Sequence, residues 1–332
     1  MPKTVRSSIP VVLAVLIGGG LFYYAFRDVD VGELARSFRN LNLLWLPVLV
    51  SLPVLDLWLR ALRWRILLRP VVDADVKLLF QLEAIGIAIN NVLFLRVGEL
   101  ARAVVGGQEL KVSTLSVLAT LIVERICDLT ALLILFTACA LAMPELIERR
   151  IALYALAASI GAAASLAGIT ALGARVRGGG SLRWLRRWPR VEKLASDLIQ
   201  GSLGLRPLSA SLKVAALSVG LWLVDATICW FGGLAMGFSA ADFGPLHGVV
   251  VVVTAAAASA LPAVPGAFGN FEAAVRMLLE HFGFAKAVAL GYAAVIHLIM
   301  YAVVTTLGLV FFYRLGHTFA GLKAAIQARG KS

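Results

Sequence analysis

Long runs of apolar residues are the feature that most constrains the fold of this chain. Six of these runs approach or exceed the roughly 20 apolar residues that an α-helix needs to cross a bilayer. Of the 332 residues, 60% are hydrophobic and only 15% are charged, a composition that no soluble globular domain can bury. The sequence therefore predicts an all-α polytopic membrane protein, with a single transmembrane domain over residues 1–332. Its six full spans are expected at Ile9–Phe26, Leu43–Leu59, Ser113–Ala142, Ile151–Leu172, Leu212–Met236 and Ala287–Tyr313.

Two further apolar regions, residues 78–107 and 246–282, are each interrupted near the middle by residues that break helices or carry polar groups. Unpaired backbone at membrane depth is tolerated only inside protein or beside a water-filled cavity. Both regions are therefore predicted to form helical hairpins around a polar cavity. The interrupting residues are Asn90, Asn91, Arg96 and Gly98 in the first region and Pro262, Pro265, Gly266 and Gly269 in the second.

Basic residues in the loops predict how these two regions cross the membrane. They concentrate in "RALRWRILLRP" (residues 60–70, after the second span), in the loop 173–211 and in the C-terminal tail. All three segments fall on the cytoplasmic face, as the positive-inside rule requires, only if each broken region enters and leaves on the same side. The interpretation is two re-entrant hairpins that face opposite ways, with cytoplasmic N- and C-termini. Within the loop, residues 181–200 are expected to form an amphipathic helix on anionic lipids of the cytoplasmic leaflet.

The two broken regions also share a weak sequence similarity. "RVGELARA" (residues 96–103) and "AFGNFEAA" (residues 267–274) align at Gly98 and Gly269, and each is followed one long helix later by Glu124 or His297. Inverted repeats with broken helices are typical of secondary transporters, which bind substrate near the bilayer midplane. In the second region Pro262, Pro265, Gly266 and Gly269 would form the hinge, as Gly98 would in the first, and Asn270 would cap the next helix. The N–H groups at that helix start would suit a phosphate or carboxylate.

Ionisable residues within the apolar segments are the candidates for substrate contacts. Glu124 and Asp128 are four residues apart and share one helix face, with Arg125 beside them. At the centre of a spanning helix each such residue costs about 2.5–3.5 kcal/mol, so they are expected to face the bundle interior and to pair. Glu272 and Arg276, again four apart, are expected to neutralise each other. The predicted substrate-binding residues are Arg96, Glu99, Arg102, Glu124, Arg125, Asp128, Asn270, Glu272, Arg276 and His297.

Several classes of function find no support in the sequence. The formal net charge of +12 could indicate nucleic-acid binding, but the basic residues lie in short loops beside apolar spans, which favours anionic headgroups. The histidines are scattered, HExxH and Walker A motifs are absent, and the three cysteines lie within apolar segments. No metal, cofactor or ATPase activity is predicted.

Four segments in order, "RALRWRILLRP", "NNVLFLRVGELARA", "ERICDLTALLILF" and "LPAVPGAFGNFEAAV", resemble the flippase-like membrane family named for the lysylphosphatidylglycerol synthase transmembrane region. That family includes the membrane half of the bacterial multiple peptide resistance factor, which moves aminoacylated phosphatidylglycerol between leaflets; other members are implicated with isoprenoid-linked sugars and hopanoids. The resemblance implies an eight-segment domain with re-entrant helices around a lipid-headgroup cavity. It maps the site onto Arg96, Glu99, Glu124, Arg125, Asp128, Asn270 and Glu272.

The resistance factors carry a soluble aminoacyl transferase domain after the membrane part, whereas this sequence ends at Ser332 after a short basic tail. Synthase activity is therefore not expected. The leading interpretation is a flippase of the bacterial inner membrane that moves an anionic or aminoacylated phospholipid, or a polyprenyl-phosphate-linked lipid. The alternatives are an integral membrane transferase that uses a lipid-linked donor, with paired carboxylates as acid and base, and a non-catalytic partner of a lipid-synthesis enzyme. A homo-oligomer is a further possibility.

Overall fold

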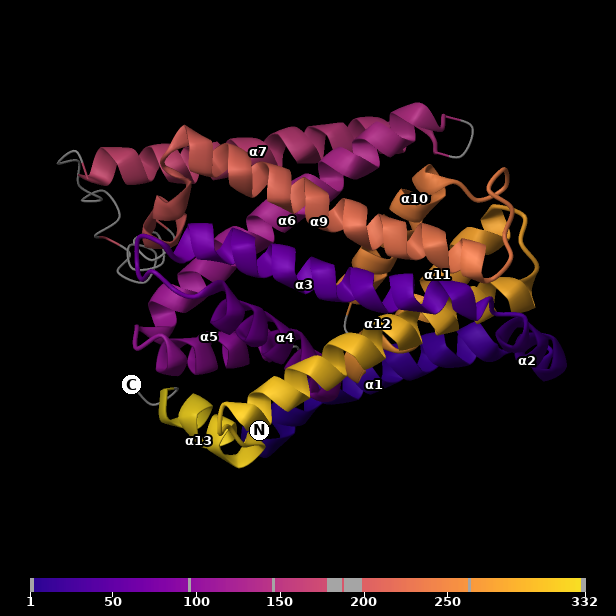
Figure 1. Ribbon diagram of the computed structural model, residues 1–332, viewed down its shortest axis with the longest axis horizontal. Helices are drawn as coiled ribbons and strands as arrows, with labels where there is room; N and C mark the ends of the chain where they lie inside the picture. The colour runs from indigo at the N-terminus through magenta and orange to yellow at the C-terminus, as the bar shows by residue number, and fades with distance from the viewer. Residues whose placement is uncertain are drawn as a thin grey trace. The chain divides into compact units, whose positions relative to one another are not determined.

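The fold was analysed in a computed structural model, which describes residues 3–94, 97–144, 147–177, 187, 199–261 and 264–329. Within these ranges all regular secondary structure is helical (Figure 1). The chain forms two compact units, and each contains segments that are far apart in the sequence. Unit 1 comprises Met1–Asp56, Ala84–Gly98 and Leu223–Val310, and unit 2 comprises Leu57–Glu83, Glu99–Trp222 and Phe311–Ser332.

The six predicted spans are all helices. Their bounds lie within a few residues of those expected, except that the first helix begins earlier and the second continues further along the chain. These helices are α1 (Lys3–Phe26), α3 (Leu46–Leu68), α6 (Thr114–Ala142), α7 (Arg149–Arg177), α9 (Leu208–Ala235) and α12 (Lys286–Arg314). Among the described residues, four helical segments are long and apolar enough to cross a membrane, namely Leu43–Leu68, Arg149–Ala171, Leu208–Ala235 and Lys286–Arg314. The chain is thus an all-α membrane protein with several apolar helices. A full crossing by α1 and α6 stays a prediction.

Both interrupted regions consist of two helices with a break between them, as predicted. The first pair is α4 (Val76–Val92) and α5 (Gly98–Glu109), and the second is α10 (Pro245–Ala260) and α11 (Asn270–His281), with the short 3-10 turn η5 (Pro265–Ala267) inside the break. The two helices of each pair contact each other: the first residue of α5 lies against Gly86 and Asn90 of α4, and α11 packs against α10. Their re-entrant course through a bilayer stays a prediction.

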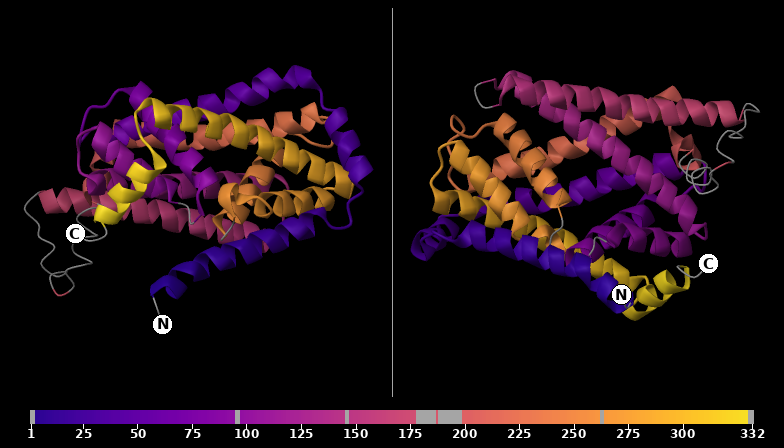
Figure 2. Two further views of the ribbon diagram at one scale, coloured as in Figure 1. Left: turned by 90° about the horizontal axis from the view of Figure 1, so that it is seen from below. Right: turned by 180° about the vertical axis from the view of Figure 1, so that it is seen from behind.

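In unit 1, α11 packs against both α10 and α1 (Figure 2). The contact with α1 is close, because a Cβ atom added at Gly269 would overlap the carbonyl oxygen of Gly18. Buried Ala25, Ala273 and Leu290 form a small core there, covered by half-buried Leu21, Tyr24, Phe26, Val29 and Leu34. The amphipathic α2 (Val31–Arg39) follows α1, and its first turn is capped by the Asp30 carboxylate, which accepts the Glu33 N–H at 2.8 Å. The break before α11 therefore lies between α10 and α1.

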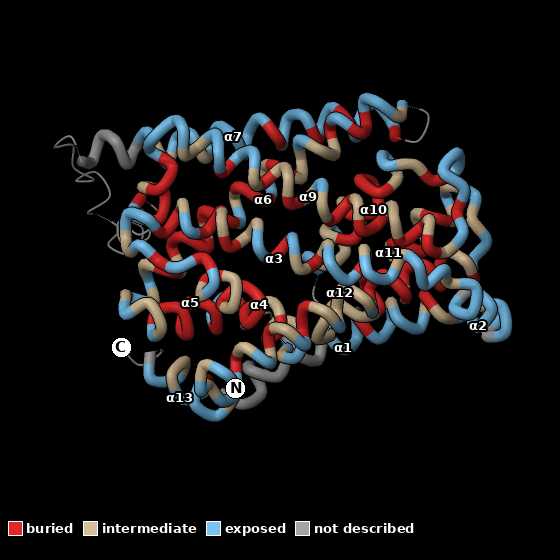
Figure 3. Tube along the Cα trace, viewed as in Figure 1, coloured by how far each residue is buried: buried red, intermediate tan, exposed pale blue. Residues whose placement is uncertain are grey.

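In unit 2, α6 packs against α7, and the two helices lie at an angle to each other (Figure 2, right). Figure 3 shows that much of α7 is exposed, whereas α6 has a continuous buried face. The buried side of α6 carries Thr120, Glu124 and Asp128 in addition to apolar residues, so the interior of this unit is charged as well as apolar. The 3-10 turns η1 (Leu43–Trp45) and η4 (Leu203–Leu205) precede α3 and α9, and α13 (Phe319–Arg329) follows α12.

Two expected boundaries are corrected. The second span was predicted to end at Leu59, but α3 continues as a helix to Leu68. The basic loop was expected over residues 173–211, but α7 extends to Arg177 and α9 begins at Leu208. Most of the expected amphipathic helix at residues 181–200 lies outside the described residues. The extension of α3 changes the functional site, because it places Arg63, which was expected in a basic surface segment, inside unit 2.

Candidate functional site

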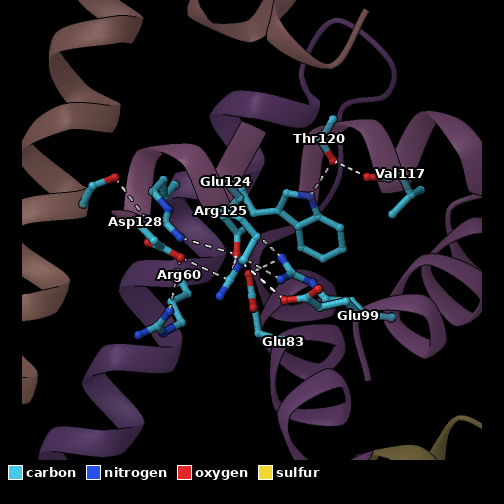
Figure 4. Close-up of polar contacts among 12 residues, drawn as sticks. Arg60, Glu83, Glu99, Val117, Thr120, Glu124, Arg125 and Asp128 are labelled. Atoms are coloured by element: carbon cyan, nitrogen blue, oxygen red, sulfur yellow. Dashed lines mark hydrogen bonds and ion pairs between the residues drawn. The ribbon is translucent and has the colours of Figure 1, made fainter. Parts of the chain in front are cut away.

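A cluster of buried charges occupies the interior of unit 2 (Figure 4). It joins side chains from four helices, and we call it the charge cluster. Helix α3 contributes two arginines, α4 a glutamate, α5 a glutamate and an arginine, and α6 an arginine with two carboxylates. Its members are Arg60, Arg63, Glu83, Glu99, Arg102, Glu124, Arg125 and Asp128. Four guanidinium groups thus face four carboxylates, which balances the formal charge in an apolar surrounding.

Glu124 lies at the centre of the charge cluster. Its side chain is fully buried, and its two carboxylate oxygens accept hydrogen bonds from the two terminal nitrogens of Arg102, each at 3.1 Å. Arg125 donates to the same carboxylate at 2.7 Å, and an Nη atom of Arg63 lies 3.4 Å away. Paired geometry of this kind is the strong form of a guanidinium–carboxylate contact. One carboxylate therefore ties α6 to both α3 and α5.

Arg63 and Asp128 form the second buried pair. The Arg63 side chain is completely buried, and its Nη1 atom donates to Asp128 and, at 3.0 Å, to the hydroxyl of Ser218 on α9. Arg60, one turn earlier on α3, has a terminal nitrogen 3.9 Å from Asp128. The indole N–H of Trp222 donates to the backbone carbonyl of Asp128 at 3.1 Å. The middle of α9 is thereby attached to α3 and α6 at the same point.

Arg102 lies between two carboxylates and an aromatic ring. It pairs with Glu83 of α4 as well as with Glu124, and its guanidinium carbon is 3.8 Å from the centre of the Trp64 ring. This distance is well within the range of a cation–π contact. Trp64 is itself fixed, because its indole N–H donates to the Thr120 hydroxyl at 3.0 Å. The two terminal nitrogens and one face of the Arg102 guanidinium are thus held by groups of the chain.

Among its described residues, the charge cluster is most exposed at one edge. The side chains of Arg125 and Glu99 are 46% and 49% exposed, whereas those of Glu124, Asp128 and Arg102 are at most 6% exposed. Arg125 and Glu99 are 3.6 Å apart, and Arg125 also contacts Asp128 at 3.1 Å. An exposed cation with a weakly held carboxylate partner is a place where a ligand can exchange with that partner. Among the described residues of the charge cluster, this edge is the accessible part.

Five of the predicted site residues meet in this cluster, namely Glu99, Arg102, Glu124, Arg125 and Asp128. Arg102 is indeed a partner of Glu124, as expected, and the other expected partner, Arg96, lies outside the described residues. Sequence reasoning missed Arg63 and Glu83 as buried members and placed Arg63 in a cytoplasmic basic segment. Arg60 was expected both in that segment and, with Asp56, on one face of the second span. A signal was present: Leu57, Ala61, Trp64 and Leu68 recur at helical spacing and are all buried, which indicates that the helix continues through the arginines.

The second group of predicted residues lies in unit 1, around the break before α11. Glu272 is buried, and its carboxylate accepts the backbone N–H of Gly269 at 2.7 Å while the other oxygen lies 2.6 Å from Nδ1 of His297 on α12. Phe271 stacks on the His297 ring, with centroids 4.4 Å apart, and covers this pair. The Glu272 side chain therefore attaches the helix break directly to α12.

Two details expected of this second group are wrong. Glu272 does not neutralise Arg276; Arg276 instead contacts Glu280 at 2.5 Å and donates to the carbonyl oxygens of Tyr24 and Ala25 at 2.9 and 2.7 Å. These carbonyls belong to the last turn of α1, which has no intrahelical donors for them, so Arg276 acts as a C-terminal cap. Asn270 is not the N-cap of α11, because Gly269 occupies that position; the Asn270 side chain donates to the Ala258 carbonyl at 3.2 Å.

The hinge residues have the conformations that their types predict. Gly266 and Gly269 have φ angles of 71° and 85°, in the left-handed region that glycine tolerates. Pro265 begins the turn η5, and Pro262 lies outside the described residues. Gly98 is required for a different reason, since a Cβ atom there would overlap the carbonyl oxygen of Gly86 and lie 2.5 Å from the Asn90 side chain. The first hinge is thus a close helix contact and the second a backbone reversal.

The two broken regions make corresponding contacts within their own units. In unit 2, Arg102 of the second short helix pairs with Glu124 of the following long helix; in unit 1, Glu272 of the second short helix pairs with His297 of the following long helix. In both cases the pairing residue comes three or four positions after the aligned glycine. Among the described residues, no group of three or more His, Cys, Asp or Glu side chains could hold a metal ion.

The chain is of the class of helical membrane proteins that have a buried ionic cluster and interrupted helices. In this class the ionisable residues of the interior are the first candidates for the functional site. The particular family follows from the sequence comparison: residues 11–308 match the family described as the lysylphosphatidylglycerol synthase TM region, and the chain belongs to that family. No curated protein and no solved structure is significantly similar to the chain. Its function is accordingly related to membrane lipids.

Proposed function

We propose that this protein is a flippase that moves an anionic or aminoacylated phospholipid, or a polyprenyl-phosphate-linked lipid, between the leaflets of the bacterial inner membrane. The observation that carries the proposal is the exposed edge of the charge cluster. Arg125 offers a guanidinium group that is bound weakly by Glu99, at 3.6 Å, and firmly by Glu124 and Asp128 behind it. The family membership supports a lipid as the substrate.

The edge offers complementary groups to both parts of a charged headgroup. A phosphate entering this edge takes the place of the Glu99 carboxylate at Arg125, with which it shares the geometry of two neighbouring oxygens. An ammonium group on an aminoacylated headgroup then pairs with the released Glu99. The buried pairs behind this edge remain in place and hold Arg125 in position. The acyl chains stay in the lipid while the headgroup crosses.

The buried pairs also explain why the site costs less than isolated charges would. A single charge at the centre of a spanning helix costs about 2.5–3.5 kcal/mol on an insertion scale, and the six charges of the cluster that lie behind the exposed edge would not be retained without partners. Pairing offsets part of that cost, and it leaves the interior polar. A polar interior that reaches the surface lowers the barrier for a headgroup that must leave water.

The experiment is headgroup translocation in proteoliposomes, measured with fluorescent phosphatidylglycerol, lysyl-phosphatidylglycerol, polyprenyl phosphate and phosphatidylcholine. The test variants are Arg125→Gln and Glu99→Gln. The matched controls are Arg36→Gln and Glu33→Gln, which neutralise an exposed ion pair of similar length, 3.8 Å, on α2. We expect transport of the anionic or aminoacylated lipids to fall at least about tenfold in Arg125→Gln, because a charge-assisted bond to the phosphate is lost.

Glu99→Gln should selectively impair transport of the aminoacylated lipid. Equal rates for all lipids in every variant, with the controls also unchanged, would contradict a headgroup site at this edge. If none of the lipids moves, and the purified protein instead converts a lipid-linked donor to product, a membrane transferase would replace the flippase proposal. Cytoplasmic termini, the inner-membrane location, and a homo-oligomer or a separate lipid-synthesis enzyme as partner remain parts of this proposal.

A further inference from the structure

A pocket of about 300 Å³ lies in unit 2 where α3 ends and α9 begins. It shares no residue with the charge cluster. Its lining combines two basic side chains, a serine, and apolar or small residues that form the walls. The lining residues are Ile66, Arg69, Pro70, Leu203, Gly204, Pro207, Ser209, Ala210 and Lys213.

The walls of the pocket are fixed by close packing. A Cβ atom added at Gly204 would lie 2.7 Å from the carbonyl oxygen of Ile66 and from the Cα atom of Leu67. The turn η4 therefore rests directly on the last turn of α3, at a distance that only glycine allows. The Ser211 hydroxyl donates to the carbonyl of Leu205 and so attaches η4 to the first turn of α9. The pocket is consequently a built feature of unit 2.

The described lining of the pocket carries positive charge and no acidic residue. Neither Arg69 nor Lys213 forms an ion pair with any residue in the part of the chain that the structure describes. Both residues are exposed. The first turn of α9, at Ser209, adds backbone N–H groups and the positive end of a long helix dipole on the same side. Two cations, a hydroxyl and a helix start together match a phosphate group.

The position of the pocket relative to the apolar spans favours a lipid over free phosphate as the source of that phosphate group. The apolar segments Leu43–Leu68 and Leu208–Ala235 are two of the four that can cross the membrane, and the pocket lies at the end of one and the start of the other. Lipid phosphates lie at this depth, just outside the hydrocarbon core. The apolar wall formed by Ile66 and Leu203 suits the glycerol and first acyl carbons of a lipid, which free phosphate lacks.

We propose that this pocket binds the phosphate of an anionic phospholipid as a site separate from the transport edge at Arg125. The bound lipid joins α3, η4 and α9 at the membrane surface. The occupant is a glycerophospholipid with a net negative headgroup, and zwitterionic phosphatidylcholine is excluded by its trimethylammonium group, which would face Arg69 and Lys213. The proposal does not depend on transport and can hold even if the chain moves no lipid.

The test is thermal unfolding of the purified full chain in a neutral maltoside detergent, titrated with short-chain phosphatidylglycerol. Because a ligand that binds only the folded state raises the unfolding midpoint by mass action, the titration reports an apparent affinity. The test variant is Arg69→Gln with Lys213→Gln. The matched control is Lys77→Gln with Lys323→Gln, which removes two exposed positive charges that do not line the pocket. Parallel titrations use inorganic phosphate and short-chain phosphatidylcholine.

We expect the pocket variant to lose at least about tenfold in apparent affinity for phosphatidylglycerol, because charge-assisted bonds to the phosphate are removed. The control should stay within about threefold, since it loses only general surface attraction. An equal loss in both variants, or none in either, would overturn the proposal. Stabilisation by inorganic phosphate as strong as by phosphatidylglycerol would overturn the lipid assignment, as would equal binding of phosphatidylcholine. Unfolding of the variants without lipid must match that of the native chain; if it does not, Arg69→Lys with Lys213→Arg should restore affinity.

Discussion

Replacing Glu124 by glutamine should destabilise the protein strongly, because it removes the central carboxylate of the charge cluster. Glu124 contacts Arg63, Arg102 and Arg125, at distances between 2.7 and 3.4 Å, and is fully buried. Glutamine keeps the shape but leaves the buried guanidinium groups with one counter-charge fewer. Breaking a buried ion pair from one side costs about 3–5 kcal/mol, since an uncompensated charge remains. We expect a loss of this size in the free energy of unfolding.

Replacing Glu99, at the exposed edge of the charge cluster, by glutamine should destabilise the protein much less. Glu99 is 49% exposed and lies 3.6 Å from Arg125, so Glu99→Gln should cost no more than about 1 kcal/mol. The free energy of unfolding can be measured by titrating detergent-solubilised protein with sodium dodecyl sulfate and following tryptophan fluorescence. Trp64 lies against Arg102 inside the cluster and is one of the seven tryptophans that contribute to this signal.

A double-mutant cycle separates the pair from its surroundings. Glu124→Gln is combined with Arg102→Met, which keeps an unbranched stem over the Trp64 ring. Neighbouring charged groups couple by about 0.5–3 kcal/mol in such cycles, and we expect a value near the upper end, so that the double variant is less destabilised than the sum of the single ones. A cost of Glu124→Gln below about 1 kcal/mol, or a coupling energy near zero, would refute the reasoning that these pairs offset the burial of charge.

Three further substitutions test the helix breaks. Gly98→Ala should destabilise the α4–α5 contact by about 1–3 kcal/mol in the same unfolding titration, because its Cβ atom would overlap the carbonyl oxygen of Gly86. Glu272→Gln should cost about 1.5–3 kcal/mol and increase amide hydrogen exchange at residues 264–270, because a buried charge-assisted bond to the Gly269 N–H is lost. Arg276→Gln should speed exchange in residues 22–29 by leaving the carbonyls of Tyr24 and Ala25 without their donor.

Each of these substitutions has a matched control elsewhere in the chain. Gly220→Ala on α9 meets no atom within 4 Å and should be neutral or slightly stabilising, since alanine favours helix by about 1 kcal/mol. Glu148→Gln and Lys286→Gln remove exposed charges of the same sign as Glu272 and Arg276. If the controls change stability or exchange as much as the test variants, charge or composition alone would account for the effects, and the specific contacts would not.

The sequence by itself determined the positions of the helices and of the two breaks. Apolar runs of spanning length predicted six helices, and the structure has a helix at each. The breaks at Gly98 and Gly266–Gly269 were predictable because glycine and proline act through the local backbone, where no distant residue is needed. The family was identifiable from the sequence for a similar reason, since motif order along the chain carries it.

Only the tertiary structure decided which charges are partners. Arg63 was expected in a surface segment, yet it is buried against Asp128, 65 positions away. Glu272 and Arg276 had the spacing of a local pair. In the structure Glu272 contacts His297 instead, and Arg276 donates to the last turn of α1. Local spacing fixes which groups are able to meet along one helix, whereas a buried charge selects whichever partner packing brings within reach, because leaving it without one costs several kcal/mol. That choice depends on contacts between distant segments, which no short stretch of sequence contains.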